Sequence, residues 1–221
     1  SFQYGGRKVR IEIFRPANSV VAPAALVLHG ASGVGDGWFV YPFAQALAER
    51  GVSAAVVHYY DGLGRRKGKA SPKIFAARAK ILESAVNFML SRKDVRPDEI
   101  GVYGMSLGGF HALALGVSDP RVKAVASLGG ALSVHIPDRL VGLLPATLLL
   151  HGSSDRVVPV DRALDVSRAM ERHGVVADMK LYAGEGHTLS PVAHDDAVQT
   201  VARFLAEGLR PPRHLAESDG R

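Results

Sequence analysis

A serine in a glycine-rich stretch is the first candidate for chemistry in this sequence. Residues 104–109 read GMSLGG, which places Ser106 in a G-x-S-x-G pattern. An apolar stretch at 100–103 precedes it and helical spacing follows, the context in which this motif holds a serine on a tight strand-to-helix turn. Glycines two positions to either side fit, because such a turn leaves no room for side chains there. We interpret Ser106 as a nucleophile rather than part of a chance glycine-rich turn.

An acid is expected between Ser106 and a catalytic histidine. A serine hydroxyl is a weak nucleophile near neutral pH and needs a base that an acid holds in place. With this motif the chain order is serine, acid, histidine. Asp155 lies in a polar loop after the apolar residues 146–150. It is favoured over Asp138, which occupies a less typical position.

The base is predicted from the same order. His187 follows residues 177–181, which we expect to form a strand, and lies in a loop with two glycines, which lets its imidazole reach Ser106. His194 is a weaker alternative and is better placed at the start of the last helix. The sequence therefore predicts a triad of Ser106, Asp155 and His187.

Backbone amides are expected to stabilise an oxyanion beside the serine. The helix that begins at Leu107 directs its positive end, and the Leu107 N–H, toward that position. A second donor should come from the glycine-rich loop after the apolar residues 24–28. We assign it to the Ala31 N–H, with Ser32 as the neighbouring possibility, and interpret His29 as a structural anchor.

Apolar segments alternate with helical patterns along the whole chain, and this alternation must position the triad. We expect an edge strand with one solvent-exposed face at 8–14 and further strands at 24–28, 53–59, 100–103, 122–128, 146–150 and 177–181. We expect helices at 41–50, 74–91, 107–115, 161–173 and 195–209. Such a chain favours an α/β fold with a mostly parallel central sheet covered by helices on both faces. Ligands then bind beyond the carboxyl ends of the strands, where the triad residues fall.

Length and composition limit the classes of protein. The 221 residues fit one domain, 1–221, with a frayed tail from about residue 210. The absence of cysteine excludes a thiol nucleophile, thiolate metal sites and disulfides. No apolar run is long enough to span a membrane. We expect a cytoplasmic protein, although a removed leader stays open because the sequence lacks an initiator Met and a signal-peptide core.

Several motifs fail when their spacing is tested. Gly33, Gly35 and Gly37 lack the spacing of a dinucleotide site, and Gly68-Lys69 lacks the residues of a phosphate-binding loop. The nine histidines form no metal-binding motif, so we expect no metal and no cofactor. The net charge of +6 comes with no nucleic-acid module, and we expect no nucleic-acid partner.

The substrate contacts are less well defined by sequence. Trp38 and Tyr60 are candidate apolar contacts, although packing explains each equally well. Arg65 and Arg66, in a basic segment at 65–69, could bind a substrate carboxylate, and a purely solvated loop is the alternative. The segment 131–145 is short for a lid, which predicts an open site.

Together these motifs resemble the dienelactone hydrolase family. The resemblance runs from about residue 27 to 205 and rests on HG at 29–30 with the glycine-rich loop, GMSLGG at 104–109, HGSSD at 151–155 and GEGH at 184–187. It implies the α/β-hydrolase fold with a minimal lid and a cofactor-free enzyme acting on small molecules. The best-known members carry cysteine where this chain has Ser106, so we expect general ester or lactone hydrolysis through an acyl-enzyme.

Two other functions are weighed against this hypothesis. A peptidase of the prolyl-oligopeptidase type would share the triad order, but no propeller domain precedes the motifs. A non-catalytic ligand-binding protein could keep the fold without turnover, but such a protein would usually lack one of the three triad residues. The oligomeric state is left open.

Overall fold

A seven-stranded sheet forms the centre of the computed structural model, which describes residues 1–18, 20–35, 37–66, 71–133, 136–175 and 177–210. The strands lie in the order β3-β5-β4-β6-β7-β8-β9, and all neighbours are parallel except β3 and β5. Their bounds are β3 Ile11–Phe14, β4 Ala22–Leu28, β5 Ser53–Val57, β6 Val95–Met105, β7 Val122–Leu128, β8 Ala146–Gly152 and β9 Ala177–Tyr182. The predicted mostly parallel sheet is therefore confirmed.

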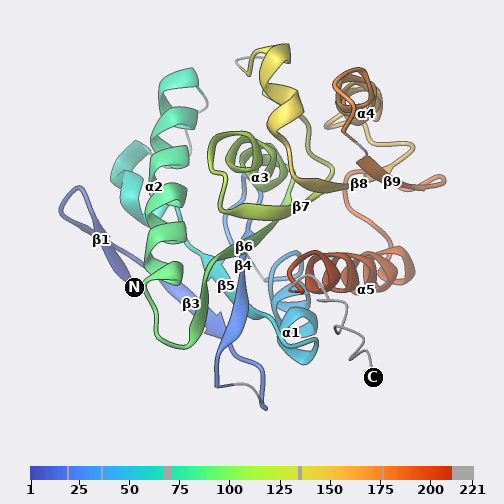
Figure 1. Ribbon diagram of the computed structural model, residues 1–221. Coiled ribbons are helices and arrows are strands. Elements are labelled where there is room, and N and C mark those ends of the chain that lie inside the picture. The colour runs from blue at the N-terminus through green and yellow to red at the C-terminus, as the bar shows by residue number, and fades with distance from the viewer. Residues whose placement is uncertain (19, 36, 67–70, 134–135, 176, 211–221) are drawn as a thin grey trace, which may run out of the picture.

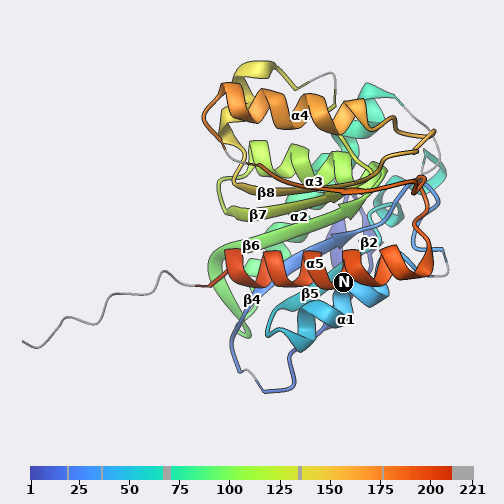
Figure 2. The ribbon, with the colours of Figure 1, turned by 90° about the vertical axis from the view of Figure 1, so that its right-hand side faces the viewer.

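Helices cover both faces of this sheet (Figures 1 and 2). Their bounds are α1 Tyr41–Glu49, α2 Pro72–Leu90, α3 Leu107–Ser118, α4 Asp161–Arg172 and α5 Pro191–Gly208. Figure 2 shows α3 and α4 on one side of the sheet and α1 and α5 on the other. Each side has its own apolar core, with Leu82 and Leu113 in one and Phe43 and Leu205 in the other. Among the described helices, none combines the length and apolar composition needed to cross a membrane.

The N-terminal segment differs from the prediction. We expected a single edge strand at 8–14, but β2 (Arg7–Val9) pairs with β1 (Phe2–Tyr4) in a separate hairpin, and only β3 joins the sheet. Arg10 separates the two strands: its amide and its guanidinium both bind the Asp61 carboxylate, at 3.2 and 3.1 Å. An amide directed at a side chain interrupts the ladder, so the chain changes partner there.

The predicted helix ends also have physical causes in the structure. Ser71 caps α2 by accepting a hydrogen bond from the Ile74 amide at 3.2 Å, and Pro72 occupies the first turn, where its missing N–H costs nothing. The segment predicted as a short lid contains a six-residue 3₁₀ helix, η2 (Asp138–Leu143). The C-terminal tail, predicted to be frayed, lies outside the described residues from 211 onward.

Two buried histidines belong to an aromatic stack under the carboxyl edge of the sheet. His111 on α3 stacks on Phe75 at 4.1 Å between ring centroids and meets the edge of Tyr59, which stacks on His29 at 3.9 Å. Neither ring nitrogen of His111 has a hydrogen-bond partner in the described part of the chain. Burial, together with the charges of Arg78 and His29, lowers the pKa of His111 to about 3. His111 is therefore neutral and packs as an aromatic ring.

This burial predicts a specific acid sensitivity. Because the pKa of His111 is lower in the folded than in the unfolded chain, the unfolded chain binds more protons below about pH 6.5, and the free energy of unfolding falls there by about 1.4 kcal/mol per pH unit. His111→Phe keeps the stacking and removes the titration. Between pH 7 and 5 the variant should lose about 2 kcal/mol less stability than the parent chain in urea unfolding. Parallel losses in both proteins would contradict this account.

Candidate active site

The turn at Ser106 holds its backbone in a conformation that L-residues rarely adopt. Ser106 has φ of 52° and is the one non-glycine residue with positive φ in the described part of the chain. A Cβ at Gly104 would lie 2.1 Å from the Gly108 carbonyl oxygen, and one at Gly108 would lie 2.3 Å from the Leu28 carbonyl oxygen. Only glycine fits these positions, as the motif predicted. Backbone strain of this kind, about 1–3 kcal/mol, is typical of functional sites.

The structure brings the three predicted triad residues into one hydrogen-bonded chain. The His187 Nδ1 lies 2.7 Å from Asp155 Oδ2, and its Nε2 lies 2.9 Å from Ser106 Oγ. A carboxylate can only accept, so Nδ1 carries the proton and Nε2 is left to accept the serine hydroxyl. Each residue follows the carboxyl end of a different strand, namely β6, β8 and β9.

Asp155 is held as a carboxylate by several donors. Its other oxygen, Oδ1, accepts the amides of Val157 at 2.8 Å and Val158 at 2.9 Å. Burial alone would raise the pKa of Asp155, but the hydrogen bonds from His187 and from these two amides outweigh it and lower the pKa. A buried neighbour, His151, places its Nε2 2.8 Å from the Val158 carbonyl oxygen and fixes the same turn. Asp155 is thus ionised, and its Oδ2 accepts a hydrogen bond from His187 Nδ1.

The loop after β4 is oriented by three side-chain donors. The hydroxyl of Tyr59 donates to the His29 carbonyl at 2.7 Å, and that of Tyr60 donates to the Ala31 carbonyl at 2.9 Å. Between them, the His29 Nδ1 lies 2.8 Å from the Gly30 carbonyl oxygen. Three successive carbonyl groups are therefore fixed by side chains.

These contacts set the direction of the predicted oxyanion donor. In a trans peptide unit the C=O of one residue and the N–H of the next point in opposite directions. Fixing the Gly30 carbonyl on the His29 ring therefore turns the Ala31 N–H away from that ring. Burial is the main reason that the pKa of His29 falls to about 4, so the ring stays neutral and Nδ1 is its donor. The Leu107 N–H, at the first position of α3, has no acceptor within its own helix.

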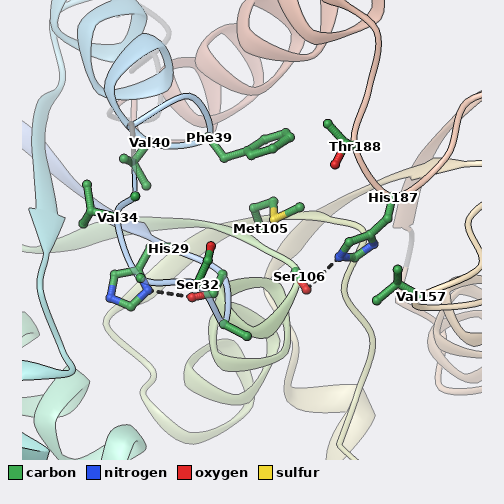
Figure 3. Close-up of a pocket in the computed structure, with 14 residues that line it drawn as sticks. His29, Ser32, Val34, Phe39, Val40, Met105, Ser106, Val157, His187 and Thr188 are labelled. Atoms are coloured by element: carbon green, nitrogen blue, oxygen red, sulfur yellow. Dashed lines mark hydrogen bonds between the residues drawn. The ribbon is translucent and has the colours of Figure 1, made fainter. Parts of the chain in front are cut away.

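A pocket of about 340 Å³ opens over Ser106 and His187. Figure 3 shows Phe39 and Thr188 above the serine and Val157 beside His187, with the loop from His29 to Val34 on the opposite side. These three wall residues were not predicted from the sequence. Val157 is 68% exposed, so this side of the pocket is open to solvent.

Comparison with known proteins agrees with this geometry. The sequence model described as "Dienelactone hydrolase family" matches residues 9–203. The chain belongs to the dienelactone hydrolase family.

Two solved structures share the family's fold with this chain. A dienelactone hydrolase from Anabaena variabilis superposes with a TM-score of 0.76 at 20% identity, over 93% of this chain and 94% of that one. Est1E from Butyrivibrio proteoclasticus gives 0.75 at 16% identity, over 93% and 96%. At these identities the likeness shows the fold.

A curated relative covers less of the family domain. YtaP of Bacillus subtilis is 32% identical over 105 residues, which are 42% of this chain and 35% of the relative. The chain spans well under two thirds of the length of this relative and of two further curated relatives that it matches.

Asp138 and His194, the alternative acid and base, have other hydrogen-bond partners in this structure. Asp138 lies at the surface, where its carboxylate binds Arg172 and His173, each at 2.9 Å. His194 is buried within α5 and places its Nε2 2.9 Å from the Trp38 carbonyl oxygen. Neither hydrogen-bonds to the Asp155–His187–Ser106 chain in the described structure.

The candidate substrate residues fall in different places. The ring of Trp38 stacks on His194 at 4.1 Å, and its neighbour Phe39 lines the pocket instead. Tyr60 lines an adjacent polar cavity and fixes the loop at Ala31. Arg65 and Arg66 end the 3₁₀ helix η1 (Asp61–Arg66), but their side chains, and residues 67–70, lie outside the described structure. Among the described residues, no cluster of three His, Asp or Glu side chains could hold a metal ion.

The tyrosine contact with the loop can be tested directly. Tyr60→Phe keeps the ring and removes the donor to the Ala31 carbonyl, so the Ala31–Ser32 peptide, which directly follows the predicted Ala31 N–H donor, loses one orienting bond. We expect kcat for an activated ester to fall about 10-fold with little change in KM, a smaller effect than the roughly 100-fold or greater loss from deleting an oxyanion donor. A control, Tyr4→Phe, changes a tyrosine on β1 outside the pocket over Ser106. Unchanged kcat in Tyr60→Phe would show that the loop holds its orientation without this bond.

Proposed function

We propose that this protein hydrolyses small carboxylic esters or lactones through an acyl-enzyme on Ser106. The continuous chain from Asp155 through His187 to Ser106, open to a pocket, is the observation that carries the proposal. Membership of the dienelactone hydrolase family supports the reaction class.

The chemistry follows from the proton positions. Ser106 Oγ attacks the carbonyl carbon while His187 Nε2 takes the hydroxyl proton, and Asp155 stabilises the imidazolium that forms. The C–O bond to the leaving group then breaks, and Nε2 returns the proton to the departing oxygen. Water attacks the acyl-enzyme by the same route, which releases the acid and restores the serine.

Stabilisation of the oxyanion is assigned to two backbone amides. The negative oxygen forms in front of the Leu107 and Ala31 N–H groups, at the positive end of α3. Because the loop at Ala31 is held by Tyr60 and His29, little reorganisation is needed as charge develops.

The nucleophile is tested by substitution and labelling. Ser106→Ala should lower ester hydrolysis by about 10³-fold or more, because triad residues act as a unit. A fluorophosphonate probe should label the parent chain and not the variant, while circular dichroism stays the same. Ser91→Ala, at the far end of α2, is the matched control and should be labelled normally. A parent chain that resists the probe would favour a binding protein over a hydrolase.

Substrate size is the second test. Two pockets border Ser106, of about 340 and 320 Å³, and both lie near the lower end of the range for small-molecule sites, about 300–1,000 Å³. Acetyl and butyryl esters of 4-nitrophenol should therefore have a higher kcat/KM than lauroyl and palmitoyl esters. A preference for the long chains would contradict the small-substrate proposal.

A further inference from the structure

Ser106 borders a second pocket on the other side of the triad. This pocket, of about 320 Å³, is lined by Ser106, Leu107, Phe75, Phe110, Ser133 and Arg162. Its walls come from α2, α3 and α4, the helices on the face of the sheet opposite α1 and α5. The first pocket takes its walls from the loop after β4 and from the segment around His187. An ester bound at Ser106 therefore has two separate spaces for its two halves.

The position of His187 determines which pocket holds the leaving group of the ester and which holds the acyl group. His187 lines the first pocket and not the second. The leaving oxygen must receive its proton from His187 Nε2, so it has to face that residue. We infer that the leaving group occupies the first pocket and that the acyl group occupies the second, lined by Phe75, Phe110 and Arg162. This inference rests on the proposed function and names its substrate class.

Two aromatic side chains, Phe75 and Phe110, determine which acyl groups the second pocket favours. Phe75 is backed by His111, which stacks on it at 4.1 Å, so its ring is held in one orientation. Phe110 lies one helical turn after the nucleophile, and its amide donates to the Ser106 carbonyl at 3.1 Å. Aromatic walls contact a planar group well by stacking or edge-to-face packing. The acyl group is therefore aromatic or otherwise planar.

Arg162 adds a positive charge to the wall of this pocket. It is the second residue of α4, is exposed, and is the one charged side chain lining this pocket in the described structure. Its Nη2 lies 3.4 Å from the Leu132 carbonyl oxygen, which steadies the guanidinium near the rim. A guanidinium has five N–H donors and suits a carboxylate. The substrate class is thus an ester of a planar dicarboxylic acid whose second carboxylate stays free.

Two isomeric esters separate the sides of the site. Monophenyl terephthalate carries its carboxylate on the acyl ring, 4-carboxyphenyl benzoate carries it on the leaving group, and phenyl benzoate is the neutral parent. Arg162→Gln should lower kcat/KM for monophenyl terephthalate about 10-fold more than for its isomer. The difference should shrink in 0.5 M salt, roughly a Debye length of 4 Å, because an exposed charge is screened. Arg168→Gln, on the same helix and outside the pocket, should show no such difference.

Each other result overturns the inference. A selective loss for 4-carboxyphenyl benzoate would place the leaving group beside Arg162. Equal losses for both isomers, or none, would show that Arg162 does not bind the acyl carboxylate. The proposed function fails separately: the parent chain would then resist the fluorophosphonate probe and cleave none of the three esters.

Discussion

The close packing of backbone against backbone around Ser106 is the constraint on which the rest of the site depends. The first turn of α3 lies so near the end of β4 that a single Cβ at Gly108 would collide with the Leu28 carbonyl. That contact fixes the distance between the nucleophile and the loop that begins at His29. Ser106, two residues earlier, has a positive φ, and its side chain hydrogen-bonds to His187. The sheet supplies the rigidity that such contact needs, because β4 and β6, the strands at this position, are each paired on both sides.

Electrostatics in the site rely on neutral rings and one buried charge. His29 and His111 are kept neutral by burial, so neither repels the imidazolium that His187 would become in the proposed reaction. The negative charge on Asp155 is offset by two amides and by His187 itself. The polar groups around Ser106 are thereby oriented before a substrate arrives, the condition under which fixed dipoles stabilise developing charge best.

The sequence was sufficient to predict which three residues the structure joins by hydrogen bonds, because the signals for them are local. Ser106 directly follows β6, whereas Asp155 and His187 lie in the loops after β8 and β9, and parallel strands bring their carboxyl ends to one edge. The walls of the pockets depend instead on loop conformations with no periodicity. Trp38 and Phe39 are neighbours that face different surroundings, and nothing in their order indicates which one reaches the pocket. The division of the segment 8–14 depended on a contact between Arg10 and Asp61, 51 positions apart.

Separate origins for the two pockets make the site modular. One pocket is built by loops that leave β4, β8 and β9, and the other by the first turns of α2, α3 and α4. Apart from Ser106 they share no wall residue among those described. A substitution in one wall therefore leaves the other intact. Natural or laboratory selection can therefore change the residues that line one pocket without changing those that line the other. Both pockets still border Ser106, the proposed nucleophile.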